Sequence, residues 1–114
     1  MERELREIEE DTLLNETQKV HSEGYRLIQI CATTVDSGYE ILYTFGKGYD
    51  ELSIRFLTKG EKPVQSISRI FPPAWLYENE IHDLFGIEVE NMTLDFRGGL
   101  YRTSVKAPFA RKEA

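Results

Sequence analysis

The spacing of the apolar residues changes along this chain from helical to alternating and then back to helical. Residues 4–22 carry intermittent apolar side chains among charged ones and stop short of Gly24, which predicts an N-terminal helix. A second helix start at Asp11 and Thr12 leaves open that the acidic first ten residues fray or form a separate turn. The apolar positions of the predicted helix are Leu5, Ile8, Leu13, Leu14 and Val20.

Three segments after this helix have the composition of β-strands, and the third has the clearest two-residue period in the chain. In the first strand, Ile28, Ile30 and Ala32 are expected to face the same way. Because the connections are short, the strands are expected to form an antiparallel meander with one apolar face. The predicted strands span residues 25–35, 39–45 and 52–56, and the predicted turns span residues 36–38, 46–48 and 59–63.

Residues 71–87 (FPPAWLYENEIHDLFGI) contain the signals for a second helix, named here the motif helix. Pro72 and Pro73 fit before or in a first helical turn, and Gly86 readily takes the left-handed conformation that follows a helix end. One buried stripe is predicted by the apolar residues at helical spacing, Ala74, Tyr77, Ile81, Leu84 and Phe85. The polar residues are expected on the solvent side, and they are Glu78, Asn79, Glu80, His82 and Asp83.

These elements predict an α+β fold in a single domain that spans residues 1–114. An antiparallel sheet of three to four strands is expected to pack against the N-terminal helix and the motif helix, and residues 87–90 can add a short edge strand. No segment approaches the roughly twenty apolar residues that span a bilayer. The N-terminus is acidic where a signal peptide would be basic, so export is not expected.

The motif helix also resembles the signature of one protein family. Trp75, residues 78–80 (Glu-Asn-Glu), Asp83 and residues 84–86 (Leu-Phe-Gly) are similar to a motif of the thirty-kilodalton subunit of NADH:quinone oxidoreductase, or complex I. That motif has an aromatic residue, Glu-Arg-Glu, Asp, two apolar residues and Gly. Subunits of membrane-bound, Ech-like nickel–iron hydrogenases carry a looser version. The similarity covers residues 64–91, including the approach to the motif at Ser66-Ile67 and Phe71-Pro72.

The chain departs from the complex I pattern at several positions. Asn79 stands where the family has the central arginine, and Met92 stands where it has a basic residue or histidine. Residues 95–102 replace the arginine-rich stretch that follows in complex I. The chain also ends soon after this segment. These differences favour the small hydrogenase-type subunit over the longer respiratory one.

The resemblance implies a non-catalytic scaffold that docks on the large catalytic subunit and helps to join the soluble arm of the complex to its membrane arm. Neighbouring iron–sulfur subunits are further expected partners, and the nickel–iron centre and clusters would belong to other chains. No catalytic, cofactor-binding or metal-binding residue is therefore expected here. The expected location is cytoplasmic, peripheral to the inner membrane through partner subunits. The expected interface residues are Trp75, Glu78, Glu80, His82, Asp83, Phe85 and Gly86.

The charge distribution argues against nucleic acid as a partner. The net charge is −6, whereas a protein that binds phosphate backbones needs a basic face. Residues 1–16 are strongly acidic, and the balance reverses from Arg97 onward. Two solvated ends explain this pattern, and the alternative is a basic tail that lies against an acidic partner surface or membrane headgroups.

The single cysteine, Cys31, limits the redox chemistry of the chain. One thiolate cannot hold an iron–sulfur cluster and cannot form an internal disulfide. Its apolar neighbours in a predicted strand favour a buried small hydrophobe over a reactive thiol. If the protein belongs to an electron-transfer complex, we expect it not to carry the electrons itself.

The motif helix offers weak signals for other chemistry. Glu78 and His82 lie one turn apart and can converge on a metal ion, but two ligands make a weak chelate and His21 lies far away in the sequence. General acid–base work needs carboxylates that face each other across a cleft, whereas Glu78, Glu80 and Asp83 share one helix. Docking on arginines or backbone amides of another subunit is the favoured role.

A second functional class stays open from the sequence. The chain can be a stand-alone small α+β ligand-binding domain or enzyme that shares the motif by chance. Such a protein needs a concave pocket with several convergent polar groups, and the sequence shows no such set. Trp75 lies off the apolar stripe and is the best single candidate for a partner contact, because exposed aromatic residues commonly anchor interfaces.

Overall fold

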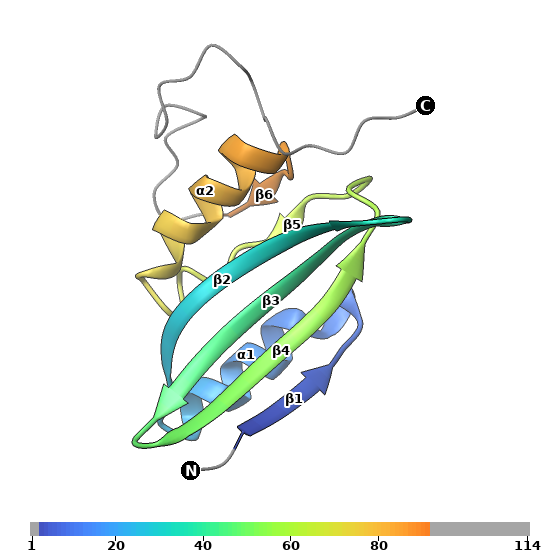
Figure 1. Cartoon of the computed structure of the whole chain (residues 1–114). Helices are drawn as coiled ribbons and strands as arrows, with labels where there is room; N and C mark the ends of the chain where they lie inside the picture. The colour runs from blue at the N-terminus through green and yellow to red at the C-terminus, as the bar shows by residue number, and fades with distance from the viewer. Residues whose placement is uncertain (1–2, 92–114) are drawn as a thin grey trace.

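The computed structural model describes residues 3–91, and its centre is a four-stranded mixed sheet (Figure 1). The order of the strands across the sheet is β1-β4-β3-β2. Strand β1 runs parallel to β4, and the other neighbouring pairs are antiparallel. The α+β fold predicted from the sequence is confirmed. The strands are β1 (Arg3–Glu7), β2 (Arg26–Val35), β3 (Gly38–Lys47) and β4 (Asp50–Thr58).

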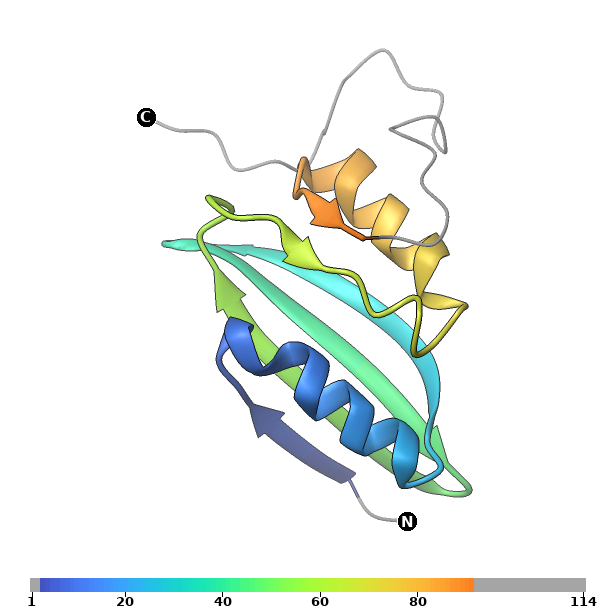
Figure 2. The same ribbon diagram turned by 180° about the vertical axis from the view of Figure 1, so that it is seen from behind.

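Two helices and a second, two-stranded sheet complete the described part of the chain. A short 3₁₀ helix η1 (Glu10–Thr12) leads into α1 (Leu13–Ser22), which lies across one face of the main sheet (Figure 2). Helix α2 (Ala74–Phe85) packs against β2. Both helices contribute to one hydrophobic core with the inward side chains of the sheet. The second sheet pairs β5 (Val64–Gln65) with β6 (Val89–Glu90) in parallel.

The N-terminal segment corrects the prediction of a helix from residue 4. Residues Arg3–Glu7 form strand β1, and α1 begins only at Leu13, close to the second start signal. Arg3 pairs with Glu51 at 3.5 Å, and Glu7 forms an ion pair with Arg55, so the alternating charges of β1 match those of β4. Long-range pairing with β4 therefore overrides the local helix propensity of this charged segment. The main sheet is mixed for the same reason, where an antiparallel one was expected.

The predicted position is confirmed for the first hairpin turn, and the second turn lies further along the chain than predicted. The first turn lies at residues 36–37, as the sequence predicted. The second lies at residues 48–49, because residues 46 and 47 extend β3 and pair with β4. Gly48 has a φ of 61°, a left-handed conformation that glycine adopts without steric cost.

A bulge in β2 corrects the predicted inward face of that strand. The register with β3 shifts between Leu27 and Gln29, so Ile28 does not follow the alternation of Ile30 and Ala32. Ile28 is 36% exposed, while Leu27 packs against the core in its place. One extra residue in a strand reverses the side on which the preceding side chains point.

The predicted limits of the motif helix are confirmed. Helix α2 follows Pro73 directly and ends before Gly86, whose φ of 73° and N–H bond to the His82 carbonyl oxygen close the helix. The strand expected at residues 87–90 is present as β6, but it pairs with β5 and not with the main sheet. The alternation predicted for residues 52–56 is confirmed, because Leu52, Ile54 and Phe56 are buried.

The position of Cys31 corrects another prediction. Its side chain is exposed, although the sequence favoured a buried one. Cys31 pairs with Leu42 on β3, on the sheet face opposite to Ile30 and Tyr43. The residues that the structure describes place both helices against the Ile30 face, so the apolar neighbours of Cys31 in sequence do not bury it. Met92, residues 95–102 and the basic tail lie outside the described residues.

Candidate functional site

Helix α2 carries all the interface residues expected from the sequence except Gly86, which follows it, and it buries several of its polar side chains. Glu78 is 2% exposed, Asn79 is fully buried and Asp83 is 8% exposed. The prediction that these three side chains lie on the solvent side is therefore wrong. Glu80 and His82 are partly buried. The helix is enclosed on two sides, since its apolar stripe faces the sheet and Glu78 faces the segment that contains β5.

The carboxylate of Glu78 accepts two hydrogen bonds from this segment. The Ser66 hydroxyl donates to Oε1 at 2.6 Å, and the Ile67 backbone N–H donates to Oε2 at 2.9 Å. The Ser66 Oγ also lies 2.7 Å from the Ser68 Oγ and accepts a bond from the Ser68 N–H at 3.1 Å. Buried polar groups need such partners, because an unsatisfied one costs about 1–3 kcal/mol. These bonds fix α2 to residues 66–68.

Burial dominates the electrostatics of Glu78. It raises the pKa of the Glu78 carboxyl to about 7, although the hydrogen bonds from Ser66 and Ile67 act in the opposite direction. Burial also raises the pKa of the Tyr43 hydroxyl, with a smaller contribution from the charge of Glu78. The Glu78 carboxyl therefore binds its proton more tightly than an ordinary exposed glutamate.

Asn79, His82 and Gly86 serve the helix itself. The Asn79 side-chain amide donates to the Trp75 carbonyl oxygen at 2.7 Å, one turn earlier on the same helix. His82 Nδ1 lies 3.3 Å from the Ile87 carbonyl oxygen, just beyond the turn at Gly86. These contacts shape α2 and its end.

The predicted apolar stripe of α2 meets the main sheet. Ala74 and Ile81 are buried, and Tyr77, Leu84 and Phe85 are partly buried. The Phe85 ring packs edge-to-face against Tyr39 with the ring centroids 6.1 Å apart. The opposite side of the helix exposes Leu76 by 42%, next to the partly buried Trp75.

The side chains of Glu78 and His82 point in different directions. Glu78 points to Ser66 and Ile67, while His82 points to Ile87, so the two side chains do not converge. Within residues 3–91, no group of three or more His, Cys, Asp or Glu side chains is placed to hold a metal ion.

Ser66 and Ser68 belong to the hydrogen-bond cluster of Glu78, which the sequence pattern did not predict. The available signal was the position of Glu78, which is four residues after Ala74 and three before Ile81 and therefore lies within the buried stripe. A carboxylate in such a stripe needs donors from another segment. Only the folded chain shows that Ser66 and Ile67 supply them.

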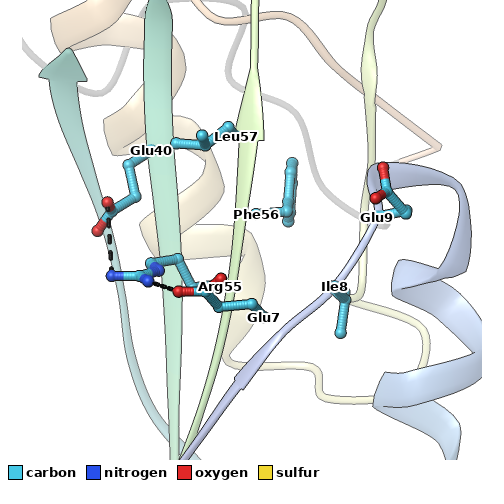
Figure 3. A pocket seen from close by; sticks show the side chains of 7 residues that line it. All are labelled: Glu7, Ile8, Glu9, Glu40, Arg55, Phe56 and Leu57. Atoms are coloured by element: carbon cyan, nitrogen blue, oxygen red, sulfur yellow. Dashed lines mark ion pairs between the residues drawn. The ribbon is translucent and has the colours of Figure 1, made fainter.

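A cavity of about 570 Å³ lies elsewhere, where β1 meets β4 (Figure 3). Arg55 points between two carboxylates there, forming ion pairs with Glu7 and with Glu40 at 3.9 Å. Its charge is therefore already compensated. The cavity is lined by Glu7, Ile8, Glu9, Glu40, Arg55, Phe56 and Leu57. The ion pairs of Arg55 support the local pairing of β1 with β4.

Comparison with known families identifies the chain. The family model described as the respiratory-chain NADH dehydrogenase, 30 Kd subunit, matches residues 6–110. The chain belongs to this family. The members of this family are subunits of an oxidoreductase complex. The match extends the similarity seen at residues 64–91 over nearly the whole sequence. No match was found among the curated proteins with which the sequence was compared. No helix within residues 3–91 is both long and apolar enough to cross a bilayer.

Proposed function

We propose that this chain is a non-catalytic docking subunit that binds the large catalytic subunit of a complex I-like oxidoreductase through the outer side of α2. The observation that carries this proposal is an exposed leucine, Leu76, on a helix whose other side chains are buried or partly buried. The helix is held by the sheet and by residues 66–68, and Leu76 is the one exposed side chain among residues 74–85, with Trp75 and Glu80 partly buried beside it. Family membership supports a role within a complex.

The proposed contact residues differ in what they do. Glu78 is buried and holds α2 through Ser66 and Ile67, Asp83 is also buried, and Gly86 ends the helix. Of the interface residues, we propose that Trp75 and Glu80 reach the partner, because Phe85 packs against Tyr39 and His82 contacts the Ile87 carbonyl oxygen. Leu76 joins this proposed set, because it is a large apolar side chain with 42% exposure. A central apolar anchor beside a charged group is typical of protein interfaces.

Within the family, the proposed branch is the Ech-like nickel–iron hydrogenase type. Asn79 supports it, because the position where the complex I motif has arginine is here fully buried and bonded to Trp75 on the same helix. An arginine at this position would need a compensating acceptor for its buried charge. Neighbouring iron–sulfur subunits are further proposed partners, and the redox chemistry would reside in those chains. The proposed location is the cytoplasmic side of the inner membrane, reached through the complex.

Co-purification tests the docking role. The chain is co-expressed with a tagged large subunit of the hydrogenase type and, separately, of the respiratory type. The test variant combines Leu76→Asp and Glu80→Arg, which change the outer side of α2. Asp83→Arg is unsuitable because its side chain is buried. The matched control combines Leu57→Asp and Glu61→Arg, which change an exposed leucine and an exposed glutamate outside α2.

The proposal predicts stoichiometric co-purification of the wild type and the control, and loss of the partner for the folded α2 variant. Capture by the hydrogenase-type subunit alone would support the proposed branch, while capture by the respiratory type alone would overturn it. If the folded wild type binds neither subunit, the docking role is wrong. The stand-alone ligand-binding domain would then be the better description.

A further inference from the structure

Ser66, Ser68 and Glu78 form a buried cluster in which the hydrogen bond between the two serines can run in either direction. The Ser66 Oγ has three polar neighbours, Glu78 Oε1 at 2.6 Å, Ser68 Oγ at 2.7 Å and the Ser68 N–H at 3.1 Å. A hydroxyl group offers one donor and two acceptor positions, so these three neighbours use its full capacity. All three residues are at most 6% exposed, so the cluster is shielded from bulk solvent.

The cluster is satisfied with Glu78 ionised. In that state the Ser66 hydroxyl donates to Glu78 Oε1, and it accepts from the Ser68 hydroxyl and from the Ser68 N–H. The Ile67 N–H donates to the second carboxylate oxygen at 2.9 Å. Each of these oxygens and N–H groups therefore has a partner.

The same heavy-atom positions allow a second arrangement with Glu78 protonated. The acid O–H then donates to Ser66 Oγ, and the Ser66 hydroxyl rotates to donate to Ser68 Oγ, since either serine oxygen can act as donor in that pair. The hydroxyl hydrogen of Ser68 then turns away from Ser66. The Ile67 N–H keeps its bond to Oε2, and the Ser68 N–H keeps its bond to Ser66. A proton can therefore be added without moving a heavy atom.

We infer that Glu78, Ser66 and Ser68 form a buried proton-binding site in which the serine pair reverses its hydrogen bonds when Glu78 takes up one proton. The site joins α2 to residues 66–68, so the proton bound there adjusts how firmly the helix is held. This inference concerns the isolated chain and does not depend on the docking role.

The surroundings of the site are compatible with this role. Burial favours the neutral acid, while the two donated bonds favour the carboxylate, and together they raise the pKa of Glu78 to about 7. From β3, Tyr43 contributes a buried neutral hydroxyl, and Glu10 of η1 acts on Tyr43. On α2, Asp83 follows five residues later and His82 follows one turn later, bonded to Ile87. Arg69, next to Ser68, is exposed.

An NMR titration tests the site. The glutamate side-chain carboxyls of the full chain are labelled with ¹³C, and the chemical shift of each carboxyl is measured as a function of pH. Glu78→Gln assigns its signal by removing it, and the exposed Glu88 serves as the internal comparison, assigned by Glu88→Gln. The expected midpoint for Glu78 is about 7. A midpoint at or below the ordinary value of 4.5 would overturn the inference.

The two serines distinguish a reversible relay from simple burial. Ser66→Ala removes the donor that stabilises the carboxylate, so the Glu78 midpoint should rise. Ser68→Ala removes the acceptor of the Ser66 hydroxyl when Glu78 is protonated, but only one of two donors to Ser66 when Glu78 is ionised. A buried hydroxyl without an acceptor costs more than the loss of one donor, so the midpoint should fall. We expect shifts of about half a unit to one unit in opposite directions, or a roughly three- to tenfold change in proton affinity. Shifts in the same direction, or none, would overturn the relay.

If an alanine variant does not fold, serine-to-threonine and serine-to-cysteine variants at the same positions replace it. Threonine keeps the hydroxyl and should leave the midpoint close to that of the wild type. Cysteine keeps the approximate size but is a weak donor and acceptor, so it should reproduce the direction of the alanine shift at each position. A threonine variant that folds and shifts the midpoint as far as cysteine would count against the relay.

Discussion

The phenolic hydroxyl of Tyr77 donates a hydrogen bond to the carbonyl oxygen of Ile28, 2.9 Å away and 49 residues earlier in the chain. Ile28 is the residue at which β2 changes register with β3. A bulge interrupts the ladder and leaves a backbone group available to another partner. The bond therefore ties α2 to the sheet at the irregular point of its edge strand.

Removing this hydroxyl should weaken the attachment of α2. Tyr77→Phe keeps the ring and removes one hydrogen bond, so we expect the free energy of unfolding to fall by about 1 kcal/mol. Chemical denaturation of the full chain measures the change. Tyr49→Phe is the matched control, because Tyr49 is 87% exposed and its loss of a hydroxyl should have no measurable effect. Equal effects of the two substitutions would contradict the structural role of the Tyr77 bond.

The stability of the chain should depend on pH through Glu78. The pKa of Glu78 is about 7 in the folded chain, whereas the ordinary value, which applies to the unfolded chain, is 4.5. The folded state therefore binds the proton more tightly than the unfolded state. The stabilisation is fully present below pH 4.5 and is lost as the pH rises through 7. As the pH rises from about 5 to about 8, the titration of Glu78 should lower the free energy of unfolding by about 2–3 kcal/mol.

Denaturation at several pH values, with Glu78→Gln as the reference, isolates this contribution. Glutamine does not titrate, so the difference in stability between the two chains should change with pH by the stated amount and in favour of the wild type at low pH. Glu61→Gln removes an exposed carboxyl and is the control. Parallel pH profiles for the wild type and Glu78→Gln would show that Glu78 does not titrate in this range.

Gly38 should tolerate alanine much less well than Gly48. A Cβ at Gly38 would lie 2.3 Å from the Thr58 carbonyl oxygen, which is backbone and cannot move away cheaply. At Gly48 no atom lies within 4 Å of the added Cβ, and only the left-handed φ of 61° is unfavourable. We expect losses of about 3 kcal/mol for Gly38→Ala and about 1 kcal/mol for Gly48→Ala, measured by thermal unfolding. A larger loss at Gly48 would mean that the packing between β3 and the end of β4 is looser than described.

Cys31 should react with a thiol reagent in the native chain. Its side chain is exposed on the sheet face opposite to Tyr43, so labelling should approach the rate measured in denaturant. The chain has one cysteine, which makes the extent of labelling a direct measurement. Protection by more than about a hundredfold would indicate that another segment covers this face. Cys31→Ser, which cannot be labelled, is the control for side reactions.

Local signals in the sequence were sufficient for several elements. Pro72, Pro73 and Gly86 predicted the limits of α2, because proline and glycine restrict or permit backbone angles regardless of distant contacts. The strict alternation of residues 52–56 predicted β4 and its buried face, since a strand places successive side chains on opposite sides. The motif around α2 also indicated the family, which the match over residues 6–110 shows.

The remaining features were decided by contacts between distant segments. Arg3–Glu7 has the composition of a helix but becomes a strand because its charges pair with those of β4. Cys31 has apolar neighbours in sequence but lies on the sheet face opposite to the helices. Glu78 is a charged residue at a position of the buried stripe, and Ser66 and Ile67 bring donors to it from another segment. Backbone preference acts within a few residues, so the sequence by itself determines it. Burial and pairing depend on which surfaces meet, and only the tertiary structure determines them.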